Sequence, residues 1–345
     1  MSEFLGPLTD PGIGTLSAIL DPVALAKHLP GFWPGPEITG AIRDIQVRLL
    51  RHHVGRRCTL EIGLRTESGW QFVIGKVYHN DRAGELEAMV KIQRVGFGPR
   101  DELSIPQPFA YIDSLRLLLQ EKVEGPTAEE VFLSGDEAGR TAAAERCARW
   151  LARFHHVAPH AGPVSHPHDY FDSKRMRRCR AEIANLDGEI AGKAARLHDL
   201  LENAAASLGD ADVCAGHGAY RPDHIILAQG RTVVFDMDTQ DVADPARDLA
   251  RFLVALRRLA LELGSIRALD AAAVAFRRTY LAEGRRGAER NLPFFEAAAC
   301  LKRAMRVLSR RDAHWRDKAE ALLDEGIRVL EEEVSSFAVR EQAHE

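Results

Sequence analysis

Three stretches in the second half of the chain decide its fold: HGAYRPDH at residues 217–224, FDMD at 235–238 and ADPARDLA at 243–250. Between the first two lie two apolar runs, IIL at 225–227 and TVVF at 232–235, which AQGR connects. Two such runs joined by a short turn that contains glycine predict a β-hairpin. The sequence therefore places several carboxyl and imidazole side chains around one short hairpin.

Helix-forming sequence surrounds this hairpin. Apolar residues recur at helical spacing over residues 138–155, which is typical of a helix that buries one face. The same pattern occurs at residues 173–207, 246–263, 268–283, 290–309 and 312–333. The second half of the chain is therefore predicted to be largely α-helical.

Runs of β-branched and aromatic residues characterise the first half. We expect an antiparallel meander of three strands at residues 45–50, 58–64 and 70–78. A helix is expected next, at 85–91, and then two more strands, at 109–112 and 115–122.

Composition shifts divide the chain into three parts. Residues 1–40 are rich in proline and glycine and are interpreted as a lead-in segment, with one short helix at 21–28 that Asp21 caps. Gly125-Pro126 marks the most prominent boundary further on. The prediction is an α+β protein with an N-terminal antiparallel β-sheet lobe at 41–125 and a larger, mostly helical C-terminal lobe at 126–345.

The charge balance restricts the partners of the protein. Its 345 residues include 46 Lys+Arg and 50 Asp+Glu, for a formal charge of −4, so no global positive field favours nucleic acid or an anionic membrane. Five widely spaced cysteines contain no CxxC pair, which argues against a zinc or redox motif. We expect a cytoplasmic protein, a monomer or homodimer, with no nucleic-acid or membrane partner.

The order of the motifs resembles the aminoglycoside phosphotransferase and choline kinase-like family of small-molecule kinases. That family has HGDxxxxN, then a strand ending in IDxD, then GDPxxDLA. Upstream, Lys76 lies in a third strand, Glu87 in the following helix, and QEKVEG at 120–125 ends a strand. The resemblance covers roughly residues 44–310 and implies a bilobal protein kinase-like fold, ATP (or GTP) and Mg²⁺ as cofactors, and a small-molecule acceptor.

The resemblance also implies roles for individual residues. It places the metal ligands at Asp236, Asp238 and His224, and the catalytic loop at His217, Ala219 and Asp223. It places nucleotide contacts at Lys76, Glu87, Gly55, Arg56, Gln120, Lys122 and Val123.

Physical chemistry supports the metal and lysine assignments. Phosphoryl transfer depends on positioning and on cations that offset phosphate charge. Asp236 ends an apolar strand, and alternation along a strand would put Asp238 on the same face. Lys76 lies in an apolar strand, where its ammonium requires an anionic partner. ATP phosphates and Glu87 are the expected partners, with Glu85 as the competing acid; an edge lysine that reaches water is the alternative.

Two departures from the family pattern concern catalysis. Ala219 stands where the family has its catalytic aspartate, and His224 where it has a metal-binding asparagine. An alanine accepts no proton, and Mg²⁺ prefers oxygen to imidazole nitrogen. Three explanations remain open: a natural degenerate kinase, a kinase that uses another group such as Asp223, or an engineered inactivating substitution.

The phosphate loop is atypical and two aspartates are expected to be structural. Gly55 is the only glycine of its turn, so Arg56 and Arg57 are candidates for cationic phosphate contacts. Asp244 is expected to cap the helix that begins at Pro245, and Asp248 to anchor the catalytic loop.

The predicted function is ATP-dependent, Mg-assisted phosphoryl transfer to a hydroxyl group of a small molecule. The alternative is a catalytically impaired pseudokinase that acts as a nucleotide-binding regulatory module, or an inactive engineered variant of an active kinase. Arg303, Arg306, Arg310 and Arg311 of the C-terminal helices favour an anionic or neutral acceptor over a cationic one, unless they form a solvated face.

Overall fold

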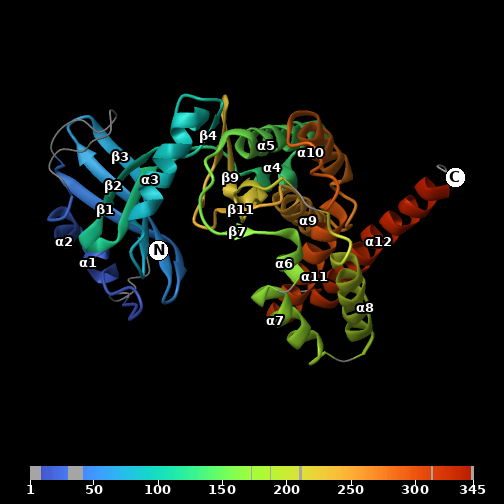
Figure 1. Cartoon of the computed structure of the whole chain (residues 1–345). Helices are drawn as coiled ribbons and strands as arrows, with labels where there is room; N and C mark the ends of the chain where they lie inside the picture. The colour runs from blue at the N-terminus through green and yellow to red at the C-terminus, as the bar shows by residue number, and fades with distance from the viewer. Residues whose placement is uncertain are drawn as a thin grey trace. The chain divides into compact units, whose positions relative to one another are not determined.

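The computed structural model describes residues 9–29, 42–171, 173–186, 188–209, 212–311 and 314–342. The chain forms two compact units. The first comprises Met1–Glu124 and Val233–Phe235, and the second comprises Gly125–Thr232 and Asp236–Glu345 (Figure 1). An antiparallel sheet in the first unit and many helices in the second confirm the predicted α+β class.

The first unit contains a five-stranded antiparallel sheet in the order β1-β2-β3-β6-β5. The predicted meander and the two later strands are confirmed. Lys76 pairs with Thr59 on one side and with Leu118 on the other, so it lies near the middle of the sheet. The strands are β1 (Asp44–His53), β2 (Arg57–Thr66), β3 (Gly69–Tyr78), β5 (Pro108–Ile112) and β6 (Leu117–Glu121), and β4 (Leu103–Ser104) is a two-residue strand outside this sheet.

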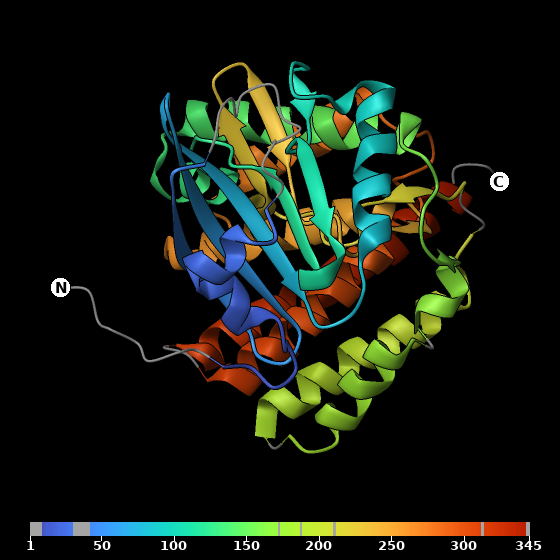
Figure 2. The ribbon, with the colours of Figure 1, turned by 90° about the vertical axis from the view of Figure 1, so that its left-hand side faces the viewer.

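The N-terminal segment helps to build the core of this unit. Helices α1 (Leu16–Leu20) and α2 (Pro22–Ala26) pack against the sheet, as Figure 2 shows. Leu16, Ile19 and Leu25 join one apolar cluster with alternate residues of β2, among them Leu60 and Ile62. Asp21 caps α2 as predicted, because its carboxylate accepts from the amide of Val23 at 2.9 Å. The described part of residues 1–40 is therefore more than the lead-in that the sequence predicted.

Helix α3 (Ala83–Ile92) packs against β5 and β6, and a π-helical turn, Gln93–Phe97, follows it. Met89 and Ile92 are the buried residues of α3. This buried face sets the direction of the acidic side chains of α3.

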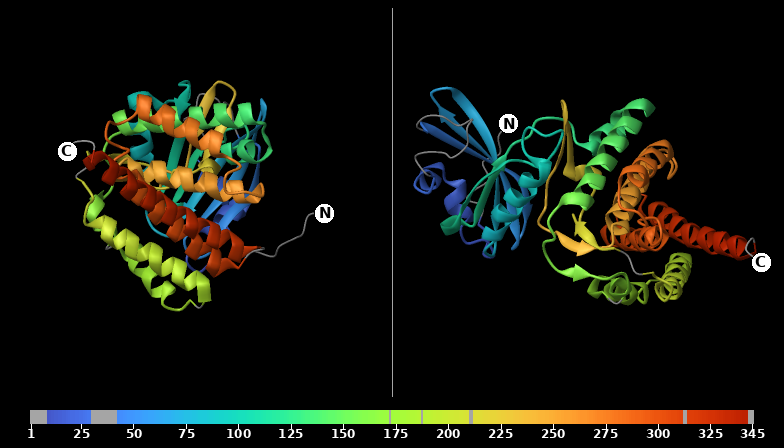
Figure 3. Two further views of the ribbon diagram at one scale, coloured as in Figure 1. Left: turned by 90° about the vertical axis from the view of Figure 1, so that its right-hand side faces the viewer. Right: turned by 45° about the horizontal axis from the view of Figure 1, so that its top comes forward.

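The second unit contains nine helices and one small sheet among its described residues, which Figure 3 shows in two further views. β9 (Ile225–Ala228) and β10 (Arg231–Val234) form the predicted hairpin, and β7 (Val164–Ser165), β11 (Asp241–Ala243) and β8 (Cys214–Gly216) are neighbours in that order. The helices are α4 (Ala128–Ser134), α5 (Glu137–Val157), α6 (Pro167–Phe171), α7 (Lys174–Ile183), α8 (Gly188–Ala205), α9 (Ala246–Glu262), α10 (Asp270–Glu283), α11 (Leu292–Arg310) and α12 (Trp315–Gln342).

Aromatic side chains pack the interior of the second unit. Phe252 of α9 stacks on Phe276 of α10 with ring centroids 4.1 Å apart, and Trp150 of α5 stacks on Phe154 at 4.9 Å. Such pairs stabilise by about 0.5–1.5 kcal/mol beyond their buried area. No helix among the described residues is long and apolar enough to cross a membrane.

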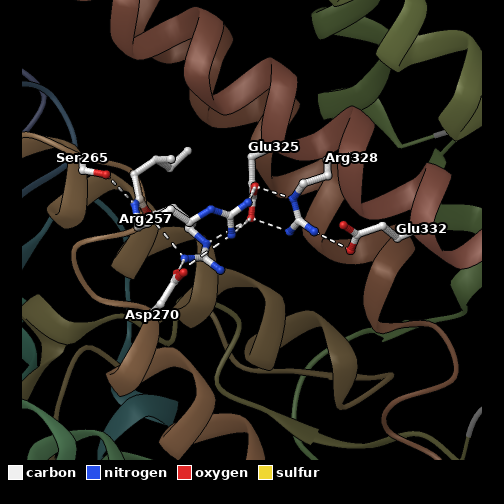
Figure 4. A network of polar contacts seen from close by, with 8 residues as sticks. Arg257, Ser265, Asp270, Glu325, Arg328 and Glu332 are labelled. Atoms are coloured by element: carbon white, nitrogen blue, oxygen red, sulfur yellow. Dashed lines mark hydrogen bonds and ion pairs between the residues drawn. The ribbon is translucent and has the colours of Figure 1, made fainter.

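An ion-pair network joins α9, α10 and α12 (Figure 4). Glu325 of α12 is nearly buried and contacts Arg257 at 3.1 Å, Arg267 at 2.8 Å and Arg328 at 2.9 Å. Asp270 also pairs with Arg257, and Glu332 with Arg328. These three arginines are therefore neutralised by carboxylates of the same network.

Candidate active site

The loop between β8 and β9 carries the motif HGAYRPDH, and Asp248 of α9 anchors this loop. The Asp248 carboxylate accepts from the amide of His217 at 2.7 Å and from that of Gly218 at 3.1 Å. Arg251 pairs with it at 3.2 Å. This geometry confirms the structural role predicted for Asp248.

A second layer supports Asp248. His155 of α5 places Nε2 3.6 Å from an Asp248 oxygen, and its Nδ1 lies 2.7 Å from the hydroxyl of Tyr280. Burial opposes ionisation, but the His155 contact and the Arg251 charge hold the pKa of Asp248 well below its usual range. Asp248 is therefore a carboxylate at neutral pH, as an anchor of two amides requires. The sequence pattern predicted no contact of His155 or Tyr280 with this anchor, because both are distant from Asp248 in the chain.

Backbone sterics fix the path of this loop. Gly218 has φ +76°, and a Cβ there would lie 1.8 Å from the carbonyl oxygen of Thr239, so only glycine is accommodated. The next anchor is Tyr220, whose buried hydroxyl donates to the Cys147 carbonyl at 2.6 Å. Ala219 lies between these two fixed positions with a half-buried methyl group.

His217, which the resemblance places in the catalytic loop, holds the backbone of that loop from within the core. It is fully buried, and its Nδ1 accepts from the amide of Ala219 at 3.3 Å. Its ring packs edge-on against Trp150 and Tyr220. The imidazole thus fixes the backbone of the loop from inside the core.

Arg221 connects the remaining polar groups of the loop. Its guanidinium donates to His224 Nε2 at 2.6 Å and to Asp223 Oδ2 at 3.0 Å. Asp236 Oδ2 lies 3.5 Å from the same His224 nitrogen. Burial, and next the Arg221 charge, lower the pKa of His224 to about 4. His224 is therefore neutral at pH 7 and carries its proton on Nδ1, because Nε2 accepts.

The expected common face of Asp236 and Asp238 is wrong. Strand β10 ends at Val234, and Asp236 has φ +67°, so the extended alternation on which that expectation rested does not continue. Among the described residues, a grouping of three or more potential ligands occurs only at His198, Asp199 and Glu202 of α8. The carboxylates of Asp236 and Asp238 and the His224 imidazole do not form such a group.

The residues present fit one hard cation but not two. His224 offers a nitrogen that already accepts from Arg221, and Mg²⁺ prefers oxygen. Asp236 offers a carboxylate with a side chain 14% exposed. Mg²⁺ commonly binds through one or two carboxylates and substrate phosphates, so Asp236 is the residue that would hold it.

In the first unit, Lys76 is 7% exposed and lies near the C-terminal end of β3, the central strand of the sheet. Glu87 is not buried with Lys76. The Glu87 side chain is 69% exposed and pairs with Lys91 at 2.7 Å. Glu85 lies four residues before buried Met89 and is only 14% exposed. Residues four apart share a helix face, so Glu85 replaces Glu87 as the sheltered acid. The spacing to Met89 was the signal that the sequence analysis overlooked.

The β1–β2 turn is occupied by the N-terminal segment. Gly55 has φ +70°, as expected for a tight turn, but its amide donates to Asp10 Oδ2 at 2.7 Å. His52 Nε2 lies 2.7 Å from the same oxygen. These contacts hold the pKa of Asp10 below its usual range, the Gly55 amide contributing most. The Gly55 amide is therefore engaged by Asp10, whereas the side chain of Arg56 is exposed.

Three further predicted nucleotide contacts, Gln120, Lys122 and Val123, lie at and just after the end of β6. Gln120 is 4% exposed and pairs with Ile74 of β3. Lys122 contacts Glu61 at 2.9 Å and Glu124 at 2.8 Å, and Val123 is half-buried. An ion pair therefore lies beside this strand end.

Asp244 caps α9 as predicted. Its Oδ1 accepts from the amide of Ala246 at 2.8 Å, and its other oxygen accepts from Asn291 at 2.8 Å. A groove of about 680 Å³ lies between α8 and α12, and its charged side chains pair with one another, for example Lys193 with Asp324.

Comparison with known proteins agrees with this geometry. A family model described as the phosphotransferase enzyme family matches residues 64–291. The chain belongs to this family. The matched span of this phosphotransferase-family protein includes Lys76, the whole motif loop and both structural aspartates, Asp244 and Asp248.

Solved structures show the same fold at low identity. Glucosamine kinase in complex with glucosamine, ADP and inorganic phosphate is 14% identical, with a TM-score of 0.61 over 85% of this chain and 84% of that one. A choline/ethanolamine kinase family protein from Mesorhizobium loti is 12% identical (TM-score 0.56; 83% and 88%). Aminoglycoside phosphotransferase APH(4)-Ia is 15% identical (TM-score 0.55; 83% and 94%). A search of the curated proteins found no match.

Proposed function

We propose that the protein transfers a phosphoryl group from ATP to a hydroxyl group of a small molecule, at a rate limited by the missing base. Membership of the phosphotransferase family carries this proposal. The anchored loop, the buried Lys76 and the Asp236 carboxylate supply its residues. A relative solved with ADP and a relative solved with a non-hydrolysable ATP analogue support the choice of nucleotide.

In this mechanism the protein mainly positions the reactants. The Lys76 ammonium binds the nucleotide phosphates and Glu85 orients it, as in the Lys–Glu pair of kinases. Bound Mg²⁺, held by Asp236, would offset the charge of the phosphates. The fixed backbone at Gly218 and Ala219 presents the loop to the acceptor hydroxyl. No side chain at residue 219 accepts the hydroxyl proton, which costs about 10²–10⁴-fold in rate.

Nucleotide binding is the first test. Mg·ATP is expected to raise the Tm of the protein, and Lys76→Met should abolish that shift because it removes the phosphate contact. Lys91→Met is the matched control, since Lys91 is exposed and pairs only with Glu87 among the described carboxylates. Equal shifts for both variants would remove Lys76 from the proposed site.

Restoring the base is the second test. Ala219→Asp should raise ATP turnover with hydroxyl acceptors by about 10²-fold or more. Coupled ADP detection across alcohols, sugars, amino alcohols and hydroxy acids provides the measurement. A protein that binds no Mg·ATP would contradict the proposal outright.

A second candidate is a nucleotide-binding regulatory module. The observation that favours it is Arg221, whose guanidinium occupies the His224 nitrogen and pairs with Asp223, the substitute base that the sequence suggested. This candidate predicts Mg·ATP binding with no turnover, even in Ala219→Asp.

A further inference from the structure

Arginines gather on one side of α11 in the second unit. Arg303, Arg306 and Arg310 are spaced three and four residues apart, and residues at this spacing share a helix face. Arg258 of α9 and Arg221 of the motif loop are also near enough to act electrostatically on Arg303. We call these five residues the Arg303 cluster.

Arg303 is the least satisfied member. Its Nε is buried and has no hydrogen-bond partner, and no carboxylate of the described residues lies within 4.0 Å of its guanidinium. Burial, and then the charges of Arg258, Arg306, Arg221 and Arg310, lower the pKa of Arg303 to about 10. The group is still protonated at pH 7, so a cation lies half-buried among other cations.

The nearby carboxylates are already engaged. Glu129 and Glu262 pair with Arg258 at 2.6 and 2.7 Å, and Asp223 pairs with Arg221 at 3.0 Å. A half-buried cation without an anion is costly, and guanidinium groups bind carboxylate and phosphate in two-point geometry. Arg303, at the centre of the cluster, therefore lacks an anionic partner among the described residues.

We propose that the Arg303 cluster binds an anionic group of the acceptor, so that the substrate is a hydroxy compound that carries a carboxylate or a phosphate. This deepens the proposed function and rests on it. Arg221 is two residues from Ala219, which places the cluster next to the loop that presents the acceptor hydroxyl. A cationic acceptor such as an amino alcohol would be repelled by the same charges.

The first experiment needs no turnover. Inorganic phosphate and citrate are titrated against the chain in thermal unfolding at constant ionic strength. Both are expected to raise Tm in the unmodified protein and in the control Arg196→Gln, whose exposed arginine pairs with Glu331 on another surface. Arg303→Gln should lose most of the shift. Equal shifts in all three proteins overturn the anion site.

The second experiment identifies the source of the anion. In the Ala219→Asp background, hydroxy acids and phosphorylated alcohols are compared with their neutral amides and unphosphorylated parents. The anionic members should show a KM about tenfold lower or more, and Arg303→Gln should remove that advantage and leave the KM for ATP unchanged. Arg303→Lys keeps the charge, so its KM advantage for anionic acceptors should lie between those of the parent variant and of Arg303→Gln.

The outcomes separate the two proposals. If anionic and neutral acceptors are used equally well, the proposed anion site is wrong, whereas the proposed phosphotransferase activity stands. Anion-dependent stabilisation without Mg·ATP binding keeps the site but overturns the phosphotransferase. Preference for the phosphorylated over the carboxylated member, or the reverse, names the anion.

Discussion

Two neighbouring residues of α9 take part in opposite electrostatic arrangements. Arg257 belongs to the network of Figure 4, in which Glu325 alone contacts three arginines. Arg258 has its own carboxylates but contributes positive charge to Arg303, which has none within 4.0 Å among the described residues. Arginine is thus a structural element in the Glu325 network, whereas Arg303 of α11 is a cation without a carboxylate partner among the described residues.

The difference teaches how to separate structure from function in an arginine-rich protein. Removing one partner of a buried ion pair leaves an uncompensated charge and destabilises strongly, whereas removing an unpaired cation leaves nothing unpaired. Stability measurements therefore distinguish the two arrangements without knowledge of the ligand.

The largest effect is expected at Glu325. Glu325→Gln leaves three arginines without their shared carboxylate and should lower the free energy of unfolding by about 3–5 kcal/mol, as urea titration would measure. Glu332→Gln, whose side chain is 66% exposed, is the control and should cost under about 1 kcal/mol. Similar losses in the two variants would mean that the network does not depend on Glu325.

The next effect concerns the anchor of the motif loop, where Arg251 is neutralised like Arg257. Asp248→Asn keeps the shape but removes the charge that holds two amides and Arg251. The expected loss is about 2–3 kcal/mol, with weaker amide protection at residues 217 and 218 in hydrogen exchange. Asp199→Asn, on an exposed position of α8, is the control. Protection that persists in Asp248→Asn would contradict the anchor.

A smaller effect should appear in the pH dependence of stability. The pKa of His224 is about 4 in the folded chain and its ordinary value is 6.5. Between these two pH values the imidazole is protonated in the unfolded chain but neutral in the folded chain. Stability from this group is complete above pH 6.5 and is lost as pH falls towards 4, by about 1.4 kcal/mol per pH unit at most. His224→Asn should flatten this part of the profile. An unchanged slope would show that the imidazole is not held neutral beside Arg221.

The smallest effect on stability is expected at Arg303. Arg303→Gln removes a half-buried cation surrounded by arginines, and should leave the free energy of unfolding unchanged or raise it by up to about 1 kcal/mol. Any gain should shrink as salt screens the repulsion. A loss comparable to that of Glu325→Gln would place a structural anion at Arg303 and remove the contrast between the two regions.

The sequence predicted most of the fold because the local signals were strong. The β-branched and aromatic runs in β2 and β3, the Asp21 cap and the helical spacing in α9 and α11 each reflect local backbone preferences. It missed α1 and its packing on the sheet, since five residues carry too little periodicity.

Within the site, prediction succeeded where one residue acts on its own neighbours in the chain, as for Asp244 capping α9. It failed where the partner is distant. The Asp10 contact with Gly55 spans 45 residues and the Asp248 contact with His155 spans 93, and no local pattern encodes either. In α3 the structure shelters Glu85 rather than the expected Glu87, because Glu85 lies four residues before the buried Met89.

The most direct test of the account is acceptor-dependent ADP formation from Mg·ATP by the Ala219→Asp variant beside the unmodified chain, with a hydroxy acid and its neutral amide as acceptors. We expect slow or undetectable turnover in the unmodified chain, turnover raised about 10²-fold or more by the restored carboxylate, and preference for the acid. Absence of turnover in both proteins despite Mg·ATP binding would contradict it and favour the regulatory module.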